Sequence, residues 1–234
     1  MQWFSAWKSP HSITPLRQSR VSSARLLNFI PRMTRTAVVF DLGKVLLHFD
    51  YGIAAEKFER RCTFAAPEIR HAIDQSPLLH GFETNQLTTE QFFAELSRTT
   101  GFSGDLAEFS EIFCNVFSPI EPMIELHAQL RSQGVPTYIF SNTNFLQIEH
   151  IRRSYPFFAN FDGYVLSCQH GVMKPYQQLY EVVERVTARR GNELLYIDDR
   201  AENVAAAVAR GWNSILHCSP ETSIAAVRAT GLLK

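Results

Sequence analysis

The chain has 234 residues with 23 basic and 23 acidic side chains, so its formal net charge is zero. Hydrophobic residues make up 45% and charged residues 20%, which is ordinary for a globular protein with one large domain or a core with a smaller insert. No apolar run reaches the roughly 18 residues of a membrane-crossing helix, and the balanced charge argues against a general nucleic-acid binder.

Residues 1–32 differ in composition from the rest of the chain. They contain no acidic residue, five basic residues and six serines. This is the composition of an organelle transit peptide, but the segment also offers little to pack and precedes the first clear strand. We predict a disordered N-terminal extension outside the fold, with organelle import as the alternative.

The cysteines are widely separated, and none has the spacing of a zinc ligand or a CxxC pair. We therefore expect buried free thiols in a reducing compartment, which predicts a cytoplasmic protein. The four positions are Cys62, Cys114, Cys168 and Cys218.

Residues 36–40 are an apolar, β-branched run that is typical of a strand buried on both faces. The signals in residues 52–117 are helical, no strand is predicted there, and the stretch holds nine phenylalanines. We predict a helical cap over 52–117, inserted into an α/β core formed by residues 33–51 and 118–234. The predicted cap helices cover 54–62, 67–75, a segment from the Thr88–Gln91 capping box to Gly101, and 103–117.

Beyond Pro119 helices and strands alternate. This alternation is typical of βαβ units, and it predicts a Rossmann-like parallel sheet with helices on both faces. The predicted helices are 122–133, 144–154, 175–191, 201–210 and 221–230, and the strands are 135–140, 163–166, 194–197 and 213–217.

Polar residues stand where chemistry is expected in such a sheet, at the carboxyl ends of its strands. Each of them alone has an ordinary explanation as a helix cap, a turn residue or a solvated charge. The fold, however, would bring all of them to one edge. They are Asp41 after the first strand, Ser141 and Asn142 after the second, Asp198 and Asp199 after the fourth, and Lys174 before the helix between the third and fourth.

These residues indicate phosphoryl transfer. Asp41, Asp198 and Asp199 would place up to three carboxylates close together, and the single charge of Lys174 does not balance them. Mg²⁺ with oxygen ligands and a phosphate partner restores the balance. Asp41 would then attack phosphorus, while residues 141–142 and backbone amides hold the phosphoryl oxygens.

The chain resembles the haloacid dehalogenase-like hydrolases, in the subfamily with a helical cap after the first strand. It is similar there to sugar-1-phosphate phosphatases and to the phosphatase domain of soluble epoxide hydrolases. The resemblance covers about residues 36–234. Four motifs carry it in order: Val-Val-Phe-Asp41-Leu-Gly-Lys-Val-Leu, Ile-Phe-Ser141-Asn-Thr-Asn, Gly-Val-Met-Lys174-Pro and Tyr-Ile-Asp198-Asp199-Arg-Ala-Glu-Asn.

The resemblance implies a Mg²⁺-dependent phosphatase of a small phosphorylated metabolite, with sugar phosphates among the candidates. From the charge and hydropathy above we expect no nucleic-acid or membrane partner. Asp41 would form an aspartyl-phosphate and bind Mg²⁺, and Lys174 would neutralise nucleophile and phosphate. The remaining roles are Mg²⁺ binding by the Gly43 carbonyl and Asp199, a second ligand or support in Asp198, and phosphoryl binding by Ser141 and Asn142.

The chain departs from the family pattern two residues after Asp41, where Gly43 stands in place of the usual acid/base aspartate. General acid–base catalysis contributes about 10²–10⁴-fold. The substitution predicts a leaving group that needs little protonation, as in anomeric sugar, acyl or aryl phosphates.

Two other functions compete with the phosphatase. A metal-independent haloacid dehalogenase also lacks the second aspartate, but Asp198 and Asp199 would repel its anionic substrate. A catalytically retired binding protein is the other alternative, against which the intact Asp41 and Lys174 argue. In each case we expect specificity to come from residues 48–51 and 79–83.

Overall fold

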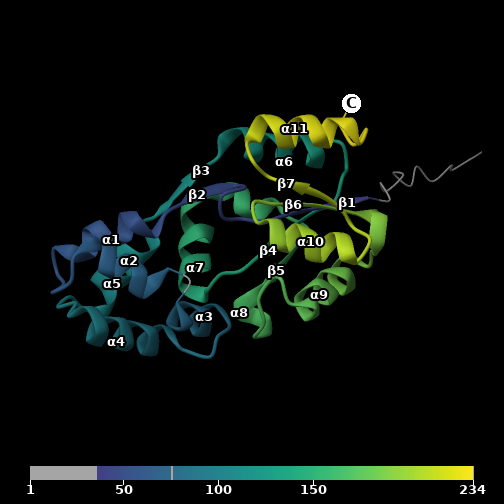
Figure 1. The fold of residues 1–234 in the computed structure, drawn as a ribbon. Coiled ribbons are helices and arrows are strands. Elements are labelled where there is room, and N and C mark those ends of the chain that lie inside the picture. Colours follow the sequence, from purple (N-terminus) through teal and green to yellow (C-terminus); the bar gives the residue numbers. More distant parts are fainter. Residues whose placement is uncertain (1–35, 75, 234) are drawn as a thin grey trace, which may run out of the picture. The chain divides into compact units, whose positions relative to one another are not determined.

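The computed structural model describes residues 36–74 and 76–233, which contain a parallel sheet of five strands in the order β5-β4-β1-β6-β7 (Figure 1). Strand β1 pairs in parallel with β4 on one side and β6 on the other. This confirms the predicted Rossmann-like α/β fold. The strands are β1 (Ala37–Phe40), β4 (Thr137–Ser141), β5 (Gly163–Leu166), β6 (Leu194–Asp198) and β7 (Asn213–Leu216).

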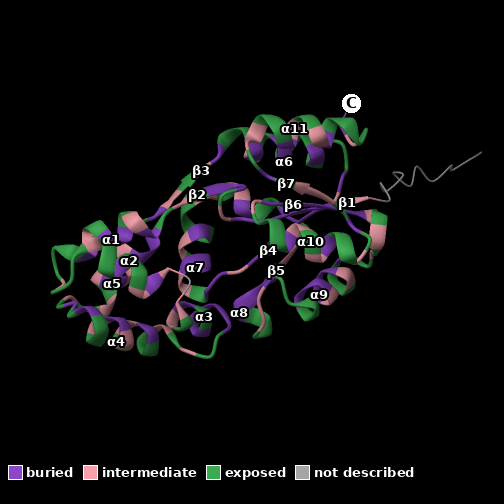
Figure 2. Ribbon diagram, viewed as in Figure 1, coloured by how far each residue is buried: buried purple, intermediate pink, exposed green. Residues whose placement is uncertain are grey.

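Helices cover both faces of the sheet, and side chains of β1 alternate between them. Val38 and Phe40 join a hydrophobic cluster with residues of α6, α7 and α11, whereas Ala37 and Val39 join one with residues of α9 and α10. Figure 1 shows α6 and α11 on the side of the sheet opposite to α9 and α10, and Figure 2 shows the central strands as buried. The helices are α6 (Glu121–Ser132), α7 (Phe145–Ser154), α8 (Ser167–His170), α9 (Gln177–Thr187), α10 (Ala201–Ala209) and α11 (Pro220–Ala229), with 3₁₀ turns at Pro156–Asn160 and Gly191–Glu193.

In the described part of the chain between β2 and β3, five helices form what we call the helical insert, which has an aromatic core of its own. Phe82 stacks on Phe92 with ring centroids 4.3 Å apart, and Phe109 stacks on Phe113 at 5.7 Å. This packing explains why the segment contains so many phenylalanines, although one of them, Phe64, is exposed. The helices are α1 (Tyr51–Glu59), α2 (Ala66–Ile73), α3 (Pro77–Glu83), α4 (Thr89–Thr100) and α5 (Leu106–Cys114).

The two ends of the insert are joined by a short antiparallel ladder that the sequence did not predict. Strand β2 (Leu47–Phe49) pairs with β3 (Phe117–Pro119), which begins inside the stretch predicted to hold no strand. Three-residue strands show no hydrophobic period, and their partners lie far apart in the chain. The sequence did not predict helices α3 and α8 either, because they too are short, with seven and four residues.

Several helix boundaries differ from the prediction because side-chain caps set them. Helix α1 begins at Tyr51 rather than at residue 54, because Asp50 accepts a hydrogen bond from the Gly52 N–H at 2.8 Å. Asp105 starts α5 in the same way, by accepting from the Glu108 N–H. The predicted capping box of α4 is present, and its end at Gly101 is confirmed by a left-handed φ of 71°.

The cysteines are free thiols, but not all of them are buried. Cys114 and Cys168 are buried and Cys62 is partly buried, whereas the expectation is wrong for Cys218, which is exposed in the loop after β7. Among the helices that the structure describes, none combines the length and apolar character needed to cross a membrane. The predicted extension at residues 1–32 lies outside the described residues.

A buried histidine on α6 makes stability sensitive to acid. His127 is 2% exposed, its Nε2 lies 3.1 Å from Thr137 Oγ1, and its ring stacks on Phe161 at 3.9 Å. Burial, with the nearby charge of Arg131, lowers the pKa of His127 from 6.5 to about 4. Between these values the unfolded chain binds a proton that the folded chain does not. The free energy of unfolding therefore decreases as the pH is lowered through that window, by about 3 kcal/mol once the pH is below both pKa values.

We expect His127→Gln, which keeps a hydrogen-bonding group but cannot titrate, to lose less stability than the wild type between about pH 7 and about pH 4. Urea unfolding at the two pH values measures the difference. Equal losses in both proteins would contradict this role for His127.

Candidate active site

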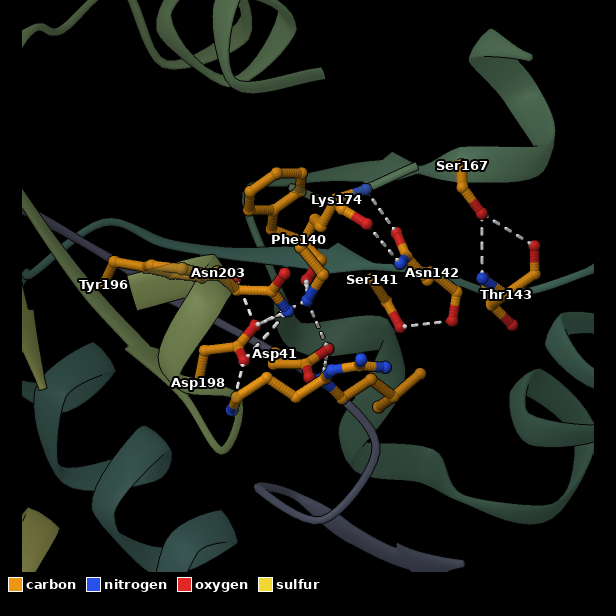
Figure 3. A network of polar contacts seen from close by, with 12 residues as sticks. Asp41, Phe140, Ser141, Asn142, Thr143, Ser167, Lys174, Tyr196, Asp198 and Asn203 are labelled. Carbon is orange, nitrogen blue, oxygen red and sulfur yellow. Dashed lines mark hydrogen bonds and ion pairs between the residues drawn. The ribbon is translucent and has the colours of Figure 1, made fainter. Parts of the chain in front are cut away.

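The strand ends bring an aspartate, a lysine and a second aspartate into direct contact. Asp41 follows β1 and Asp198 ends β6, and because β1 and β6 run side by side both carboxylates lie at one edge of the sheet. The Lys174 Nζ lies 2.9 Å from Asp41 Oδ1 and 2.7 Å from Asp198 Oδ2. Figure 3 shows the three side chains together.

Lys174 is buried together with its charge. The residue is 5% exposed, and Nζ also donates to the Phe140 carbonyl oxygen at 2.9 Å. Burial alone would lower the pKa of Lys174, but the negative charges of Asp198 and Asp41 raise it above its ordinary value. The site therefore holds a permanent ammonium group between two carboxylates.

The carboxylate of Asp198 is fully engaged by the protein. Its oxygens accept hydrogen bonds from the Tyr196 hydroxyl, from Asn203 Nδ2 at 3.0 and 3.1 Å, and from the Arg200 N–H at 2.8 Å. Burial opposes ionisation, but the Lys174 ammonium and these donors hold the pKa of Asp198 below its ordinary value. Asp198 is thus an ionised group that fixes the position of Lys174.

Asp41 is less fully compensated. Oδ1 accepts from the Leu42 N–H at 2.7 Å and faces Lys174. Burial raises the pKa of Asp41 to about 7; Lys174 opposes the shift, whereas Asp198 and Asp199 add to it. Among the described residues, the negative charge on Asp41 is only partly balanced.

A third carboxylate lies at the same place. Oxygen atoms of Asp41, Asp198 and Asp199 lie within 4.8 Å of one another. Burial and the charge of Asp198 raise the pKa of Asp199, which is only half-buried and lines the adjoining cavity. An excess of hard oxygen ligands and of negative charge fits a divalent cation such as Mg²⁺.

Ser141 ends β4 and Asn142 begins the loop that follows, and the two residues take part in the site in different ways. The Asn142 side chain donates to the Lys174 carbonyl oxygen at 3.0 Å and accepts from the Lys174 N–H at 2.8 Å. It therefore joins two loops of the site, as Figure 3 shows. Ser141 Oγ donates to the Asn142 carbonyl oxygen at 3.2 Å, and Ser141 lines the same cavity as Asp41.

Of the site residues predicted from the sequence, all except Asp198 line one cavity of about 670 Å³ between the sheet edge and the helical insert. Six of the nine positions predicted for specificity line it as well, and the other three, His48, Gly81 and Phe82, do not. Another cavity, of about 580 Å³, lies among α2, α3 and α4 and contains none of the strand-end residues. The six lining positions are Phe49, Asp50, Tyr51, Leu79, His80 and Glu83.

Several polar residues of the site were not singled out from the sequence. Tyr196 and Asn203 hold Asp198; they are the first and last residues of the motif quoted around Asp198 and Asp199, but the sequence assigned them no role. Lys44, Arg70 and Arg200 line the cavity and bring three further cations to it. Arg70 comes from α2, and its place depends on the packing of the insert, which no local pattern reveals.

Solved structures share this fold. A HAD-like family hydrolase from Porphyromonas gingivalis superposes with a TM-score of 0.73 at 24% identity, covering 83% of this chain and 97% of the other. A HAD family enzyme from Bacteroides thetaiotaomicron in complex with magnesium and inorganic phosphate gives 0.68 at 18% identity, with 77% and 92% covered. L-2-haloacid dehalogenase from Xanthobacter autotrophicus gives 0.59 at 21% identity, with 83% and 82% covered.

Curated relatives match by sequence. Sesquiterpene phosphatase astK of Aspergillus oryzae is 25% identical over 181 residues, which are 76% of this chain and 87% of that protein. Acyl-CoA dehydrogenase family member 10 of Mus musculus is 26% identical over 82% of this chain, but the match spans only 19% of that protein. Bifunctional epoxide hydrolase 2 of Rattus norvegicus is 31% identical over 46% of this chain and 21% of its own length.

The family model of the haloacid dehalogenase-like hydrolases matches residues 36–211, a range that runs from β1 into the loop after α10 and includes every site residue predicted from the sequence. The match covers most of the chain and agrees with the fold of the solved structures. The chain belongs to the haloacid dehalogenase-like hydrolases.

Proposed function

We propose that the protein is a Mg²⁺-dependent phosphatase that hydrolyses a small phosphate monoester through an aspartyl-phosphate on Asp41. The observation that carries the proposal is the buried Asp41–Lys174–Asp198 arrangement, which opens through Asp41 and Lys174 into a cavity of about 670 Å³. The negative charge of this buried nucleophile is only partly balanced by the protein. Such a site suits a reaction in which a cation binds there together with the phosphate.

In this mechanism an oxygen of Asp41 attacks phosphorus, and the bond between phosphorus and the leaving oxygen breaks. The Leu42 N–H and Lys174 fix one carboxylate oxygen of Asp41, so the nucleophile is oriented before the substrate arrives. Water then attacks the phosphorus of the aspartyl-phosphate, which releases phosphate and restores Asp41.

Lys174 would neutralise the charge that gathers on Asp41 and on the phosphoryl oxygens. Asp198 keeps it protonated and in place, since the two form an ion pair of 2.7 Å with both residues buried. Ser141 Oγ would donate to a phosphoryl oxygen. The side chain of Asn142 is engaged with the Lys174 backbone, so its contribution would come from its backbone N–H.

The residues present fit the cation that this chemistry requires. Asp41, Asp199 and the carbonyl oxygen of Gly43 would hold Mg²⁺, with Asp198 as support because its oxygens are already engaged. Mg²⁺ would supply positive charge for the phosphoryl group and the carboxylates around it.

The helical insert, predicted as residues 52–117, would act as a cap over the active site, where it would exclude water and select the substrate. Its part of the cavity wall is partly apolar, through Tyr51 and Leu79. Sugar phosphates remain candidates, and a sesquiterpenyl phosphate joins them because a relative is named a sesquiterpene phosphatase. The partner is thus a small phosphate ester.

The proposal predicts phosphate release that depends on Mg²⁺ and on Asp41. The panel would contain p-nitrophenyl phosphate, sugar phosphates, alkyl phosphates and farnesyl phosphate, each assayed with Mg²⁺ and with EDTA. We expect release from at least one ester with Mg²⁺, and loss of that release in EDTA and in Asp41→Asn.

Two results would contradict the proposal. Halide release from a 2-haloacid that persists in EDTA would favour the metal-independent dehalogenase. Absence of turnover on both substrate classes, with a phosphate ester still bound, would favour a catalytically retired binding protein.

A further inference from the structure

Glu83 is a buried carboxyl group that faces the active-site cavity from the helical insert. It is the last residue of α3, its exposed fraction is 9%, and it lines the same cavity as Asp41 and Lys174. The roles derived above for the strand-end residues make no use of it. A carboxyl group buried at this place requires its own explanation.

The backbone of Glu83 is tied to the loops of the active site. Ser167 Oγ lies 2.7 Å from the Glu83 carbonyl oxygen and 3.0 Å from that of Thr143, and it accepts from the Thr143 N–H at 2.9 Å. Figure 3 shows Ser167 and Thr143 beside Ser141 and Asn142. One hydroxyl group therefore connects the end of α3 to the loop that follows β4, and this holds Glu83 in a defined position relative to the site.

The position where this family usually carries an acid/base aspartate offers no such group in this chain. A Cβ at Gly43 would come within 3.0 Å of the Phe49 ring, which lies where a side chain at residue 43 would begin. Phe49 itself lines the cavity and offers no proton. For a leaving group that does need a proton, the general acid would have to come from another wall of the cavity.

We propose that Glu83 is the general acid and base of the reaction, a role that rests on the phosphatase function proposed above. In the first step Asp41 bonds to phosphorus, the bond to the leaving oxygen breaks, and that oxygen takes the proton of the Glu83 carboxyl group. In the second step water bonds to phosphorus, the Asp41–phosphorus bond breaks, and Glu83 takes a proton from the water. Each cycle thus returns Glu83 to its protonated state and consumes one water per alcohol and phosphate released.

The electrostatics of the site support this role. Burial raises the pKa of Glu83 to about 7; Arg200 and Lys174 oppose the shift, and Asp41 and Asp74 add to it. A carboxyl group of this kind is substantially protonated near neutral pH and can alternate between donating and accepting a proton.

The test compares leaving groups that differ in their need for a proton. Glycerol 3-phosphate and glucose 6-phosphate release alkoxides, whereas p-nitrophenyl phosphate releases a stable phenolate. We expect Glu83→Gln to lower kcat/KM on the alkyl phosphates by about 10²–10⁴-fold, and to change the single-turnover rate of p-nitrophenolate release by less than about tenfold. The second step should then limit turnover of p-nitrophenyl phosphate, which gives a burst of p-nitrophenolate.

Two variants accompany Glu83→Gln. Glu83→Asp keeps a carboxyl group but draws it back, and should give intermediate rates on the alkyl phosphates with p-nitrophenolate release retained. Glu111→Gln removes an exposed carboxylate of the same insert, on α5, and should change neither rate. Thermal unfolding of each variant verifies the fold.

The outcomes separate this inference from the function on which it rests. The role of Glu83 is overturned, and the phosphatase stands, if the wild type releases phosphate but Glu83→Gln fails to separate the two ester classes. That is the case if kcat/KM on the alkyl phosphates and the single-turnover rate of p-nitrophenolate release fall equally, or if neither changes. Turnover of p-nitrophenyl phosphate alone by the wild type would also overturn it, and would support the restricted leaving group expected from Gly43. No phosphate release from any ester would overturn the phosphatase itself.

Discussion

Asp41→Asn is expected to abolish turnover while leaving the fold as stable as the wild type. Without a nucleophile kcat should fall by about 10⁴-fold or more. Stability should not fall, because burial already raises the pKa of Asp41 to about 7, which means that the site disfavours its negative charge. The neutral amide has the same shape and removes the repulsion from Asp198 and Asp199. Phosphate release with Mg²⁺ measures the activity, and urea unfolding in EDTA measures the stability.

Glu125→Gln is the control for this prediction, because it removes an exposed carboxylate on α6, away from the cavity. It should change neither activity nor stability. Residual turnover of Asp41→Asn within about tenfold of the wild type would mean that another group attacks phosphorus.

Lys174→Met is expected to reduce both stability and activity strongly. Lys174 is the buried partner of Asp41 and Asp198, and its removal leaves Asp198 ionised or forces it to bind a proton at neutral pH. Breaking a buried ion pair in this way costs about 3–5 kcal/mol. Turnover should be lost as well, since the charge of nucleophile and phosphate is no longer neutralised. Urea unfolding in EDTA and phosphate release measure the two losses.

A double-mutant cycle gives this prediction its control. In the background of Asp198→Asn the stability lost on Lys174→Met should be clearly smaller, because the amide needs no counter-charge. Arg228→Met removes an exposed cation on α11 and should have little effect. A loss below about 1 kcal/mol in Lys174→Met would contradict a buried charge network at the sheet edge.

The parallel sheet could be predicted because its strands are long enough and apolar enough to show a pattern. Residues 36–40 and 194–197 are continuous apolar runs, and the alternation with helices after Pro119 fixes their parallel arrangement. The β2–β3 ladder could not be predicted in this way, because each strand has three residues and the partners are separated by the whole helical insert. The first residue of a helix, such as Tyr51, depends on its side-chain cap. Hydrophobic periodicity locates helix ends only to within a few residues.

The strand-end residues could be found because parallel topology brings residues after different strands to one edge. What the sequence did not reveal is how each side chain is used. The amide of Asn142 is engaged with the backbone of Lys174, and Asp198 is held by Tyr196 and Asn203. Residues of the insert, Glu83 among them, reach the cavity only through tertiary packing.

The most direct test of the account is to trap the phosphoryl group on the protein. The enzyme with Mg²⁺ and the best ester of the panel would be quenched in acid during turnover, digested and analysed by mass spectrometry. One added phosphoryl group is expected on the peptide that contains Asp41, and none in Asp41→Asn or in EDTA. A phosphoryl group on any other residue, or turnover of the ester without labelling of Asp41 in a rapid quench, would contradict it.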